Sequence, residues 1–183
     1  MIRTPFRYAG AVAAAALLAT GLASGPAQAA KSPTLLGAYR AWSAYTTGTG
    51  DSKTCYVLSQ PKSMSPKHVN RDPVFFLISD WPGRHTKAEP EVVPGYPYKS
   101  GSKVTVQVGS DKFTMFTKND NGDGDGNAWV EAKSDEPRLV GAMRRGAQMI
   151  VTGTSSRGTL TKDVYSLAGV SSALAKAHSA CGM

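Results

Sequence analysis

The sequence predicts a mainly β domain, an antiparallel β-sandwich of about seven or eight strands with two short helices late in the chain. Three observations support this fold class. Short segments rich in β-branched and aromatic residues recur along the chain, separated by Gly, Pro, Asn and Asp. Residues 103–108 alternate valine with polar residues, as a half-buried strand does. Apolar residues take a helical spacing only in the later part of the chain.

The amino terminus has the three parts of a secretory signal peptide. Arg3 and Arg7 form a basic start, residues 8–23 are an apolar run, and Ala27-Gln28-Ala29 is a small-residue cleavage site. A membrane anchor fits less well, because a spanning helix needs about 20 apolar residues and this run is shorter. We therefore predict that residues 1–29 are removed and that residues 30–183 form one domain, with residues 30–36 flexible.

The predicted mature chain is basic. Two of the 21 Lys and Arg residues lie in the signal peptide, which leaves 19 against 13 acidic residues, a formal charge of +6. Such a balance favours anionic partners such as phospholipid head groups, lipopolysaccharide or acidic glycans, or serves solubility alone. The sequence has no basic stripe interleaved with aromatic residues, so no nucleic-acid partner is predicted. No segment after the signal peptide is apolar enough to span a bilayer.

The first half of the mature chain contains apolar segments separated by turns and loops. Residues 39–45 and 54–60 are predicted to be strands joined by a turn at residues 48–51. Residues 61–72 hold two prolines and several charges, which is typical of a loop. The apolar run at residues 73–80 predicts a central strand buried on both faces. The next segments are a basic turn region (81–90), a short strand (91–93) and a turn (94–97).

The second half begins with a predicted hairpin. Residues 103–108 and 112–117 are its strands, and Gly109-Ser110-Asp111 forms its turn. Three further strands are predicted, at residues 128–132, 148–153 and 158–167.

Two helices are predicted in the later part of the chain. Asp135-Glu136-Pro137 is typical of a helix start, and the apolar residues after it predict a short helix near residues 136–145. After Gly169 the apolar spacing predicts a second helix near residues 171–180. Its apolar face is formed by Val170, Leu174, Ala177 and Cys181.

The chain has two cysteines, Cys55 and Cys181. In an exported protein such a pair is most simply a disulfide, here between an early strand and the last helix. A reactive thiol pair is the alternative, although no Cys-x-x-Cys motif is present.

Residues 119–127 contain the one candidate metal site. Asn121, Asp123 and Asp125 stand where a calcium loop places its first three ligands, and Gly126 stands at the sixth position. The twelfth position is Ala132, so the closing carboxylate of such a loop is missing. The alternative is a hairpin tip, because Gly, Asn and Asp tolerate positive φ.

The turn at Ser155, Ser156 and Arg157 is the candidate contact for an anion or a partner. Hydroxyls, backbone amides and a guanidinium are the groups that hold anions. An ordinary β-turn assisted by Gly158 is the alternative. The sequence predicts no catalytic residue and no cofactor, since paired carboxylates, a nucleotide-binding loop and a Cys/His dyad are absent from it.

Residues 36–183 resemble the invasion associated locus B family of exported bacterial proteins. The matching residues are Trp42, residues 54–60 (TCYVLSQ), Gly95-Tyr96-Pro97, Met143, residues 155–159 (SSRGT), Tyr165-Ser166-Leu167 and Cys181. The resemblance implies an immunoglobulin-like β-sandwich in the periplasm or at the cell surface, a role in host-cell invasion for some members, and no catalytic residue. Tyr45 and Thr46 stand where some relatives carry another cysteine, so a second bridge is not expected.

Three functions follow as hypotheses. The first is a non-enzymatic envelope or surface protein that binds another protein or an anionic envelope component and aids host-cell invasion. The second is a structural or stress-related periplasmic accessory protein. The third is a hydrolase with an unrecognised site. The sequence predicts neither the identity of the partner nor the oligomeric state.

Overall fold

The computed structural model of the chain describes residues 32–117 and 126–183. The predicted signal peptide (1–29) and the candidate calcium ligands Asn121, Asp123 and Asp125 lie outside the described residues.

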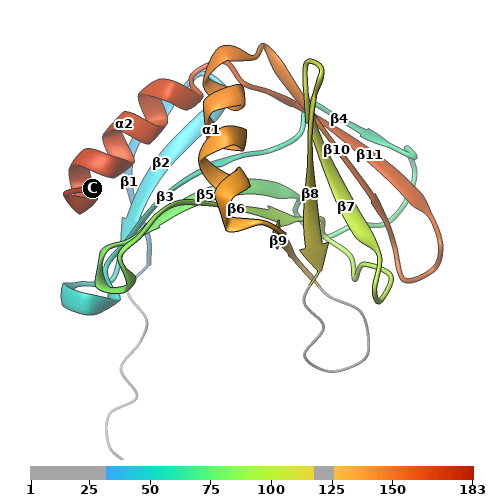
Figure 1. Ribbon diagram of the computed structural model, residues 1–183, viewed down its shortest axis with the longest axis horizontal. Coiled ribbons are helices and arrows are strands. Elements are labelled where there is room, and N and C mark those ends of the chain that lie inside the picture. The colour runs from blue at the N-terminus through green and yellow to red at the C-terminus, as the bar shows by residue number, and fades with distance from the viewer. Residues whose placement is uncertain (1–31, 118–125) are drawn as a thin grey trace, which may run out of the picture. The chain divides into compact units, whose positions relative to one another are not determined.

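The described residues form one antiparallel sheet of eleven strands and two helices (Figure 1). The strands are β1 (Thr34–Tyr39), β2 (Trp42–Thr47), β3 (Thr54–Ser59), β4 (Ser63–Ser65), β5 (Phe75–Trp81), β6 (Thr86–Val93), β7 (Lys103–Val108), β8 (Asp111–Thr117), β9 (Ala128–Val130), β10 (Gln148–Thr154) and β11 (Leu160–Ser166). The helices are α1 (Glu136–Arg145) and α2 (Val170–Cys181), and 3-10 turns are η1 (Gly50–Ser52), η2 (Pro82–Arg84) and η3 (Lys133–Asp135). The order across the sheet is β1-β2-β3-β5-β6-β9-β8-β7-β10-β11-β4.

The mainly β fold and both predicted helices are confirmed. The strand arrangement differs from the expected sandwich of seven or eight strands, because eleven strands form a single continuous sheet. The short strand β9 is the physical reason: it pairs with β6 on one side and with β8 on the other, and so joins two five-stranded halves.

The additional strands lie in segments predicted to be flexible, loop or turn; β4, for example, lies in the predicted loop at residues 61–72. Residues 34–36, assigned above to a flexible lead-in, belong to β1, which pairs with β2. β6 extends back through residues predicted to be a turn, even though it contains Pro90. The ladder between β6 and β9 involves only Glu91 and Val92, so Pro90 is not required to donate a hydrogen bond toward β9.

The core lies between the sheet and the two helices. Alternate residues of β7, such as Val104 and Val106, point into it and are fully buried. α2 packs against β1, β2 and β3, while α1 packs against β6 and β7. Trp42 is fully buried and its Nε1 donates to the carbonyl oxygen of Ser166 at 2.9 Å. One core therefore joins strands from both halves of the sheet.

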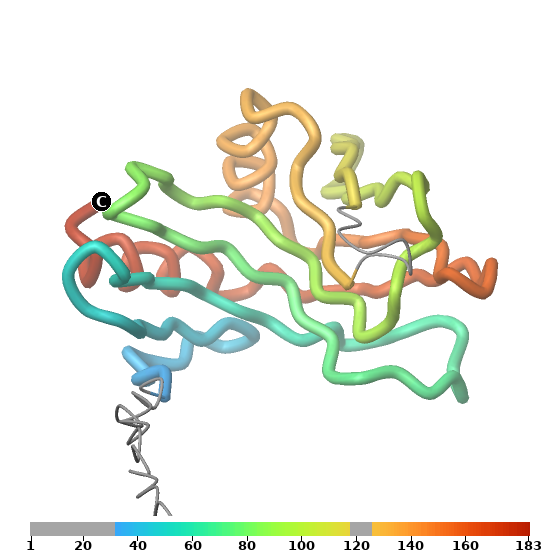
Figure 2. Tube along the Cα trace, turned by 90° about the horizontal axis from the view of Figure 1, so that it is seen from below, coloured from blue at the N-terminus to red at the C-terminus, as the bar shows by residue number. Residues whose placement is uncertain are grey.

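The domain has two distinct ends. Figure 2 shows the carboxy terminus at one end, and residues 60–73, residues 94–102 and the turn between β10 and β11 together at the other. Figure 1 shows the same grouping at the right of the picture. In the two described ranges no helix has the length and hydropathy to cross a membrane.

Candidate binding cleft

Three loops form an open cleft at the end of the domain that lies away from the carboxy terminus. Residues 68–72, residues 95–97 and the segment around the β10–β11 turn line a volume of about 570 Å³, which we call the loop cleft. Ser155, Ser156 and Arg157, the predicted candidate contact, all belong to its lining. The structure thus brings the predicted turn together with two loops that sequence reasoning did not connect to it.

The turn closes through its own backbone and leaves two of the three predicted residues available. The Ser155 N–H donates to Thr159 O at 2.9 Å, and the Gly158 N–H donates to Ser155 O at 2.8 Å. The Ser155 hydroxyl is buried and accepts from the Thr159 N–H at 3.1 Å, so it stabilises the turn. Gly158 has a φ of +84°, which glycine adopts without strain. Ser156 and Arg157 are exposed in the cleft.

Backbone contacts attach the neighbouring loop to this turn. The Ser156 N–H donates to Pro97 O at 2.8 Å, and the Lys99 N–H donates to Thr154 O at 2.9 Å. Gly153 permits this approach, because a Cβ atom there would stand 2.5 Å from Cε1 of Tyr98. Two of the three cleft loops are therefore held in a fixed relation.

A buried ion pair between Arg71 and Asp163 forms the base of the cleft. Arg71 Nη1 and Nη2 donate to the two carboxylate oxygens of Asp163 at 2.7 and 2.6 Å. Nε and Nη2 also donate to Pro94 O, at 3.0 and 2.7 Å. The side chains are only 5% and 3% exposed. We call this pair the ionic clasp, because it attaches residues 66–73 and 94–97 to β11.

The electrostatics of the clasp keep Arg71 charged. Burial alone would lower the pKa of Arg71, but the hydrogen bonds and charge of Asp163 raise it above its ordinary value. The guanidinium also lies over the ring of Tyr96, 4.8 Å from its centroid. All of these contacts are internal, so Arg71 positions the cleft and leaves ligand binding to other cations.

Tyrosines surround the clasp and remain protonated. Burial raises the pKa of Tyr96, Tyr98 and Tyr165 above the ordinary value of 10.0. The hydroxyl of Tyr96 shares a short hydrogen bond with the hydroxyl of Thr161. The base of the cleft is therefore one balanced ion pair among neutral tyrosine side chains.

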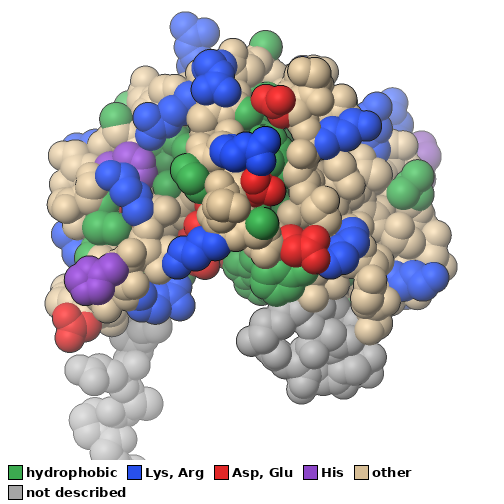
Figure 3. Space-filling view, viewed as in Figure 1, with side chains coloured by type: hydrophobic (Ala, Val, Ile, Leu, Met, Phe, Trp, Pro, Cys, Tyr) green, Lys and Arg blue, Asp and Glu red, His purple; other side chains and the backbone are tan. Residues whose placement is uncertain are grey.

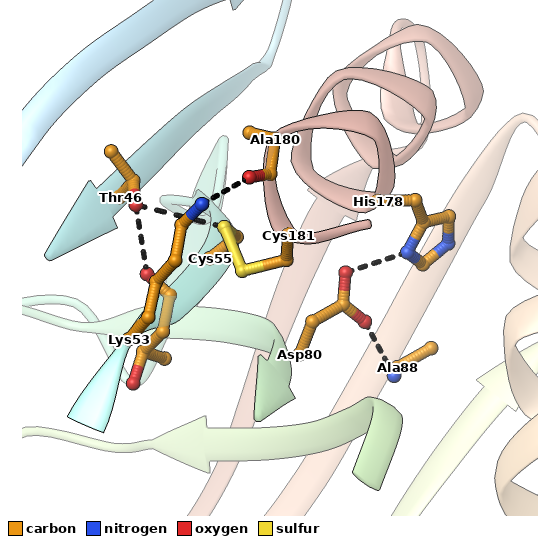
Figure 4. The surroundings of a disulfide bond; sticks show 9 residues. Thr46, Lys53, Cys55, Asp80, Ala88, His178, Ala180 and Cys181 are labelled. Atoms are coloured by element: carbon orange, nitrogen blue, oxygen red, sulfur yellow. Dashed lines mark hydrogen bonds and ion pairs between the residues drawn. A yellow bond between two sulfur atoms is a disulfide. The ribbon is translucent and has the colours of Figure 1, made fainter. Parts of the chain in front are cut away.

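The opposite end of the domain carries the predicted disulfide (Figure 4). Cys55 on β3 and Cys181 at the end of α2 are bonded with an S–S distance of 2.07 Å, which confirms the predicted bridge and excludes a free thiol pair. The Lys53 ammonium donates to Ala180 O at 2.5 Å beside it. We call the Cys55–Cys181 bond the disulfide clasp.

An Asp–His pair lies next to the disulfide clasp and was not predicted. His178 Nδ1 and Asp80 Oδ2 are 2.6 Å apart, and Asp80 Oδ1 accepts from the Ala88 N–H at 2.8 Å (Figure 4). The other ring nitrogen of His178, Nε2, lies 3.4 Å from Nη2 of Arg144. In a Ser–His–Asp triad this nitrogen would instead contact the serine hydroxyl. The pair thus connects α2 with β5 and, through Arg144, with α1.

Metal binding is not supported by the described residues. In residues 32–117 and 126–183, no three His, Cys, Asp or Glu side chains are grouped so that they could hold a metal ion. The candidate calcium ligands lie in the undescribed segment, so that hypothesis stays a prediction.

Comparisons with known proteins give a family and a fold. The model of the invasion associated locus B protein family matches residues 42–178. The crystal structure of invasion associated protein B from Bartonella henselae is similar, with a TM-score of 0.55 and 17% identity over 80% of this chain and 98% of that chain. No curated protein matches the sequence. The family, which is exported, and the disulfide together indicate an extracytoplasmic protein.

Proposed function

This chain belongs to the invasion associated locus B family, and from that premise we propose that it is an extracytoplasmic binding protein without catalytic activity. Its ligand is an acidic segment of another protein, held in the loop cleft. The observation that carries the proposal is the position of Arg157 and Ser156, which stand exposed above a base fixed by the ionic clasp.

The fixed base supports binding because a preorganised site loses little conformational entropy when a ligand enters. The ionic clasp and the backbone bonds around Ser156 hold all three loops before a ligand arrives. Arg157 has no hydrogen-bond or ion-pair partner within the described residues, so its guanidinium is available for a carboxylate. Such charge-assisted bonds are stronger than neutral ones.

The charges around the cleft favour an acidic ligand over a basic one. Arg157 and Asp72 are the exposed charged residues of the lining other than histidine. Three exposed lysines flank the same end of the domain: Lys67, Lys99 and Lys162. Elsewhere the charge is mixed, as Figure 3 shows acidic side chains among the Lys and Arg side chains of one face. Complementary charge steers association and selects partners.

Two charge-reversal variants, one in the cleft and one outside it, test the proposal. An acidic peptide titrated into the protein and followed by amide NMR should bind at the cleft, and Arg157→Glu should weaken binding at least tenfold. Lys176→Glu, on the exposed side of α2, is the matched control because it changes the net charge equally. Equal losses in both variants would show that only net charge matters, and the site would be abandoned.

Crosslinking in cells tests the class of partner. A photoreactive residue at Ser156 should capture one dominant protein, whereas the same residue at Ser172, exposed on α2, should not. Capture of lipopolysaccharide or acidic glycan from Ser156 would instead identify an anionic envelope component. Equal and diffuse capture from both positions would support a structural or stress-related accessory role.

We also propose where in the cell envelope the protein is located. We place the protein in the periplasm after removal of residues 1–29, because these residues have the composition of a signal peptide. Amino-terminal sequencing of the exported protein should begin at Ala30. An intact residue 1 in the exported protein would overturn this proposal.

A role in host-cell invasion is proposed from the description of the family alone. If the loop cleft mediates it, a strain that carries Arg157→Glu should be taken up by host cells as poorly as a strain without the protein. Normal uptake of the Arg157→Glu strain by host cells would show that the loop cleft is not needed for invasion.

A further inference from the structure

β4 leaves one edge of the sheet open beside the loop cleft. It is the last strand in the sheet order and, among the described residues, pairs only with β11. All three of its residues are exposed. Because successive residues of a strand direct their backbone groups to alternate sides, at least one N–H and one C=O of β4 face away from β11. These groups can pair with an added strand.

A groove lies beside β4, since two residues of this strand, Ser63 and Met64, line it. It has a volume of about 810 Å³ and is lined by residues 60–64, 66–69 and 71–74. Four residues line both this edge groove and the loop cleft: His68, Val69, Arg71 and Asp72. A segment lying along β4 would therefore continue into the cleft toward Arg157.

The side chains of the edge groove combine apolar and cationic groups. Met64 and Val69 are large apolar residues that are 42% and 41% exposed. Lys62 and Lys67 are exposed in the same lining, which contains Asp72 as its one exposed carboxylate. The complementary ligand is extended, with acidic side chains alternating with apolar ones.

We infer that the acidic partner segment binds as an additional antiparallel or parallel strand on β4, with its apolar side chains against Met64 and Val69 and its carboxylates near Lys67 and Arg157. This inference rests on the proposed function and specifies the form of its ligand. Pro61 and Pro66 flank β4 and keep the available edge short, which restricts addition to a few residues and disfavours unselective sheet pairing.

The other sheet edge provides an internal comparison. β1 pairs only with β2 in the described chain, has six residues and contains no charged residue. Backbone pairing alone would favour this longer edge. Binding at β4 therefore requires selection by charge and by the groove, and this separates the inference from nonspecific strand addition.

The test uses a blocked hexapeptide of alternating glutamate and valine, added to the full domain. Amide hydrogen exchange should slow at residues 63–65 and stay unchanged in β1. Two N-methylated versions, methylated on all valines or on all glutamates, should differ at least tenfold in affinity, because only one edge of the peptide faces β4. Lys67→Glu should weaken binding about tenfold, whereas Lys112→Glu, exposed on β8, should not.

The outcomes separate this inference from the proposed function. Binding that depends on Arg157, leaves the β4 amides unprotected and tolerates both patterns of N-methylation would overturn strand addition and leave the proposed function intact. Protection of β1 in place of β4 would also overturn it. Failure of every acidic peptide to bind would overturn both.

Discussion

The two ends of the domain are held by different chemistry. At one end the disulfide clasp joins residues 126 positions apart in the sequence, and at the other the ionic clasp joins residues 92 positions apart. Reduction of the bond or loss of either cysteine removes the disulfide clasp, whereas loss of either partner of the ionic clasp leaves a buried charge unpaired. Single substitutions therefore weaken either end, with the larger expected cost at the cleft end, while only the disulfide end is sensitive to redox conditions.

The largest effect is expected from breaking the ionic clasp. Asp163→Ala leaves the Arg71 guanidinium buried without its carboxylate, and loss of one partner of a buried pair costs about 3–5 kcal/mol of unfolding free energy. Urea denaturation followed by circular dichroism measures it. Asp111→Ala, at an exposed position of β8, should change stability by less than about 0.5 kcal/mol. Equal effects of the two substitutions would contradict the role of the clasp.

Removal of the disulfide clasp is expected to have the next largest effect. The variant with both Cys55→Ala and Cys181→Ala should lose about 2–4 kcal/mol, because the unfolded chain regains the entropy that the bond restricts. Binding of acidic peptides under native conditions should be unchanged, since the cleft lies at the other end. A loss of affinity in the folded variant would show that the two ends are coupled.

The Asp–His pair should contribute less than the bond beside it. His178→Ala removes a hydrogen bond to a buried carboxylate, and bonds to charged groups contribute about 1.5–3 kcal/mol. The backbone amides of α2 should exchange hydrogen faster in this variant than in the natural protein, and the exchange rates in the cleft loops should be unchanged. Replacement of the exposed His85 is the matched control and should leave α2 unchanged.

The smallest effect concerns Glu91 on β6. Burial raises its pKa above the ordinary value of 4.5, although a hydrogen bond from Asn127 opposes the shift. The folded state therefore holds this proton more tightly than the unfolded state, and stability falls as the pH rises above about 4.5. In Glu91→Gln this part of the pH dependence should disappear. The measurement is the free energy of unfolding as a function of pH. The same curve for Glu91→Gln and the natural protein would contradict the predicted role of Glu91.

The features that could be predicted from sequence depend on local pattern. The alternation in β7 and the start and spacing signals of α1 and α2 gave these elements nearly to the residue. The disulfide could be predicted because two cysteines in an exported chain leave one pairing. The turn at Ser155–Arg157 was recognised from its residue types alone.

The base of the cleft could not be predicted, because it depends on residues distant in sequence. Arg71 is one of many basic residues, and only the sheet order brings it to Asp163. One signal was present: Thr161, Asp163 and Tyr165 alternate on one face of β11, and an acid on an inward face requires a partner. The strands β1 and β4 were missed because pairing with neighbours, and not their own composition, makes them strands.

The position of β4 in the sheet has a consequence for how the domain folds. β3 and β4 are separated by only three residues in sequence, yet β3 lies third from one edge and β4 forms the other edge. The ladder of β4 is with β11, which lies far later in the chain. Such nonlocal contacts slow folding. A synthetic fragment that covers residues 60–74 would therefore contain the groove-lining side chains without their arrangement, and the recognition surface exists only once the whole domain has assembled.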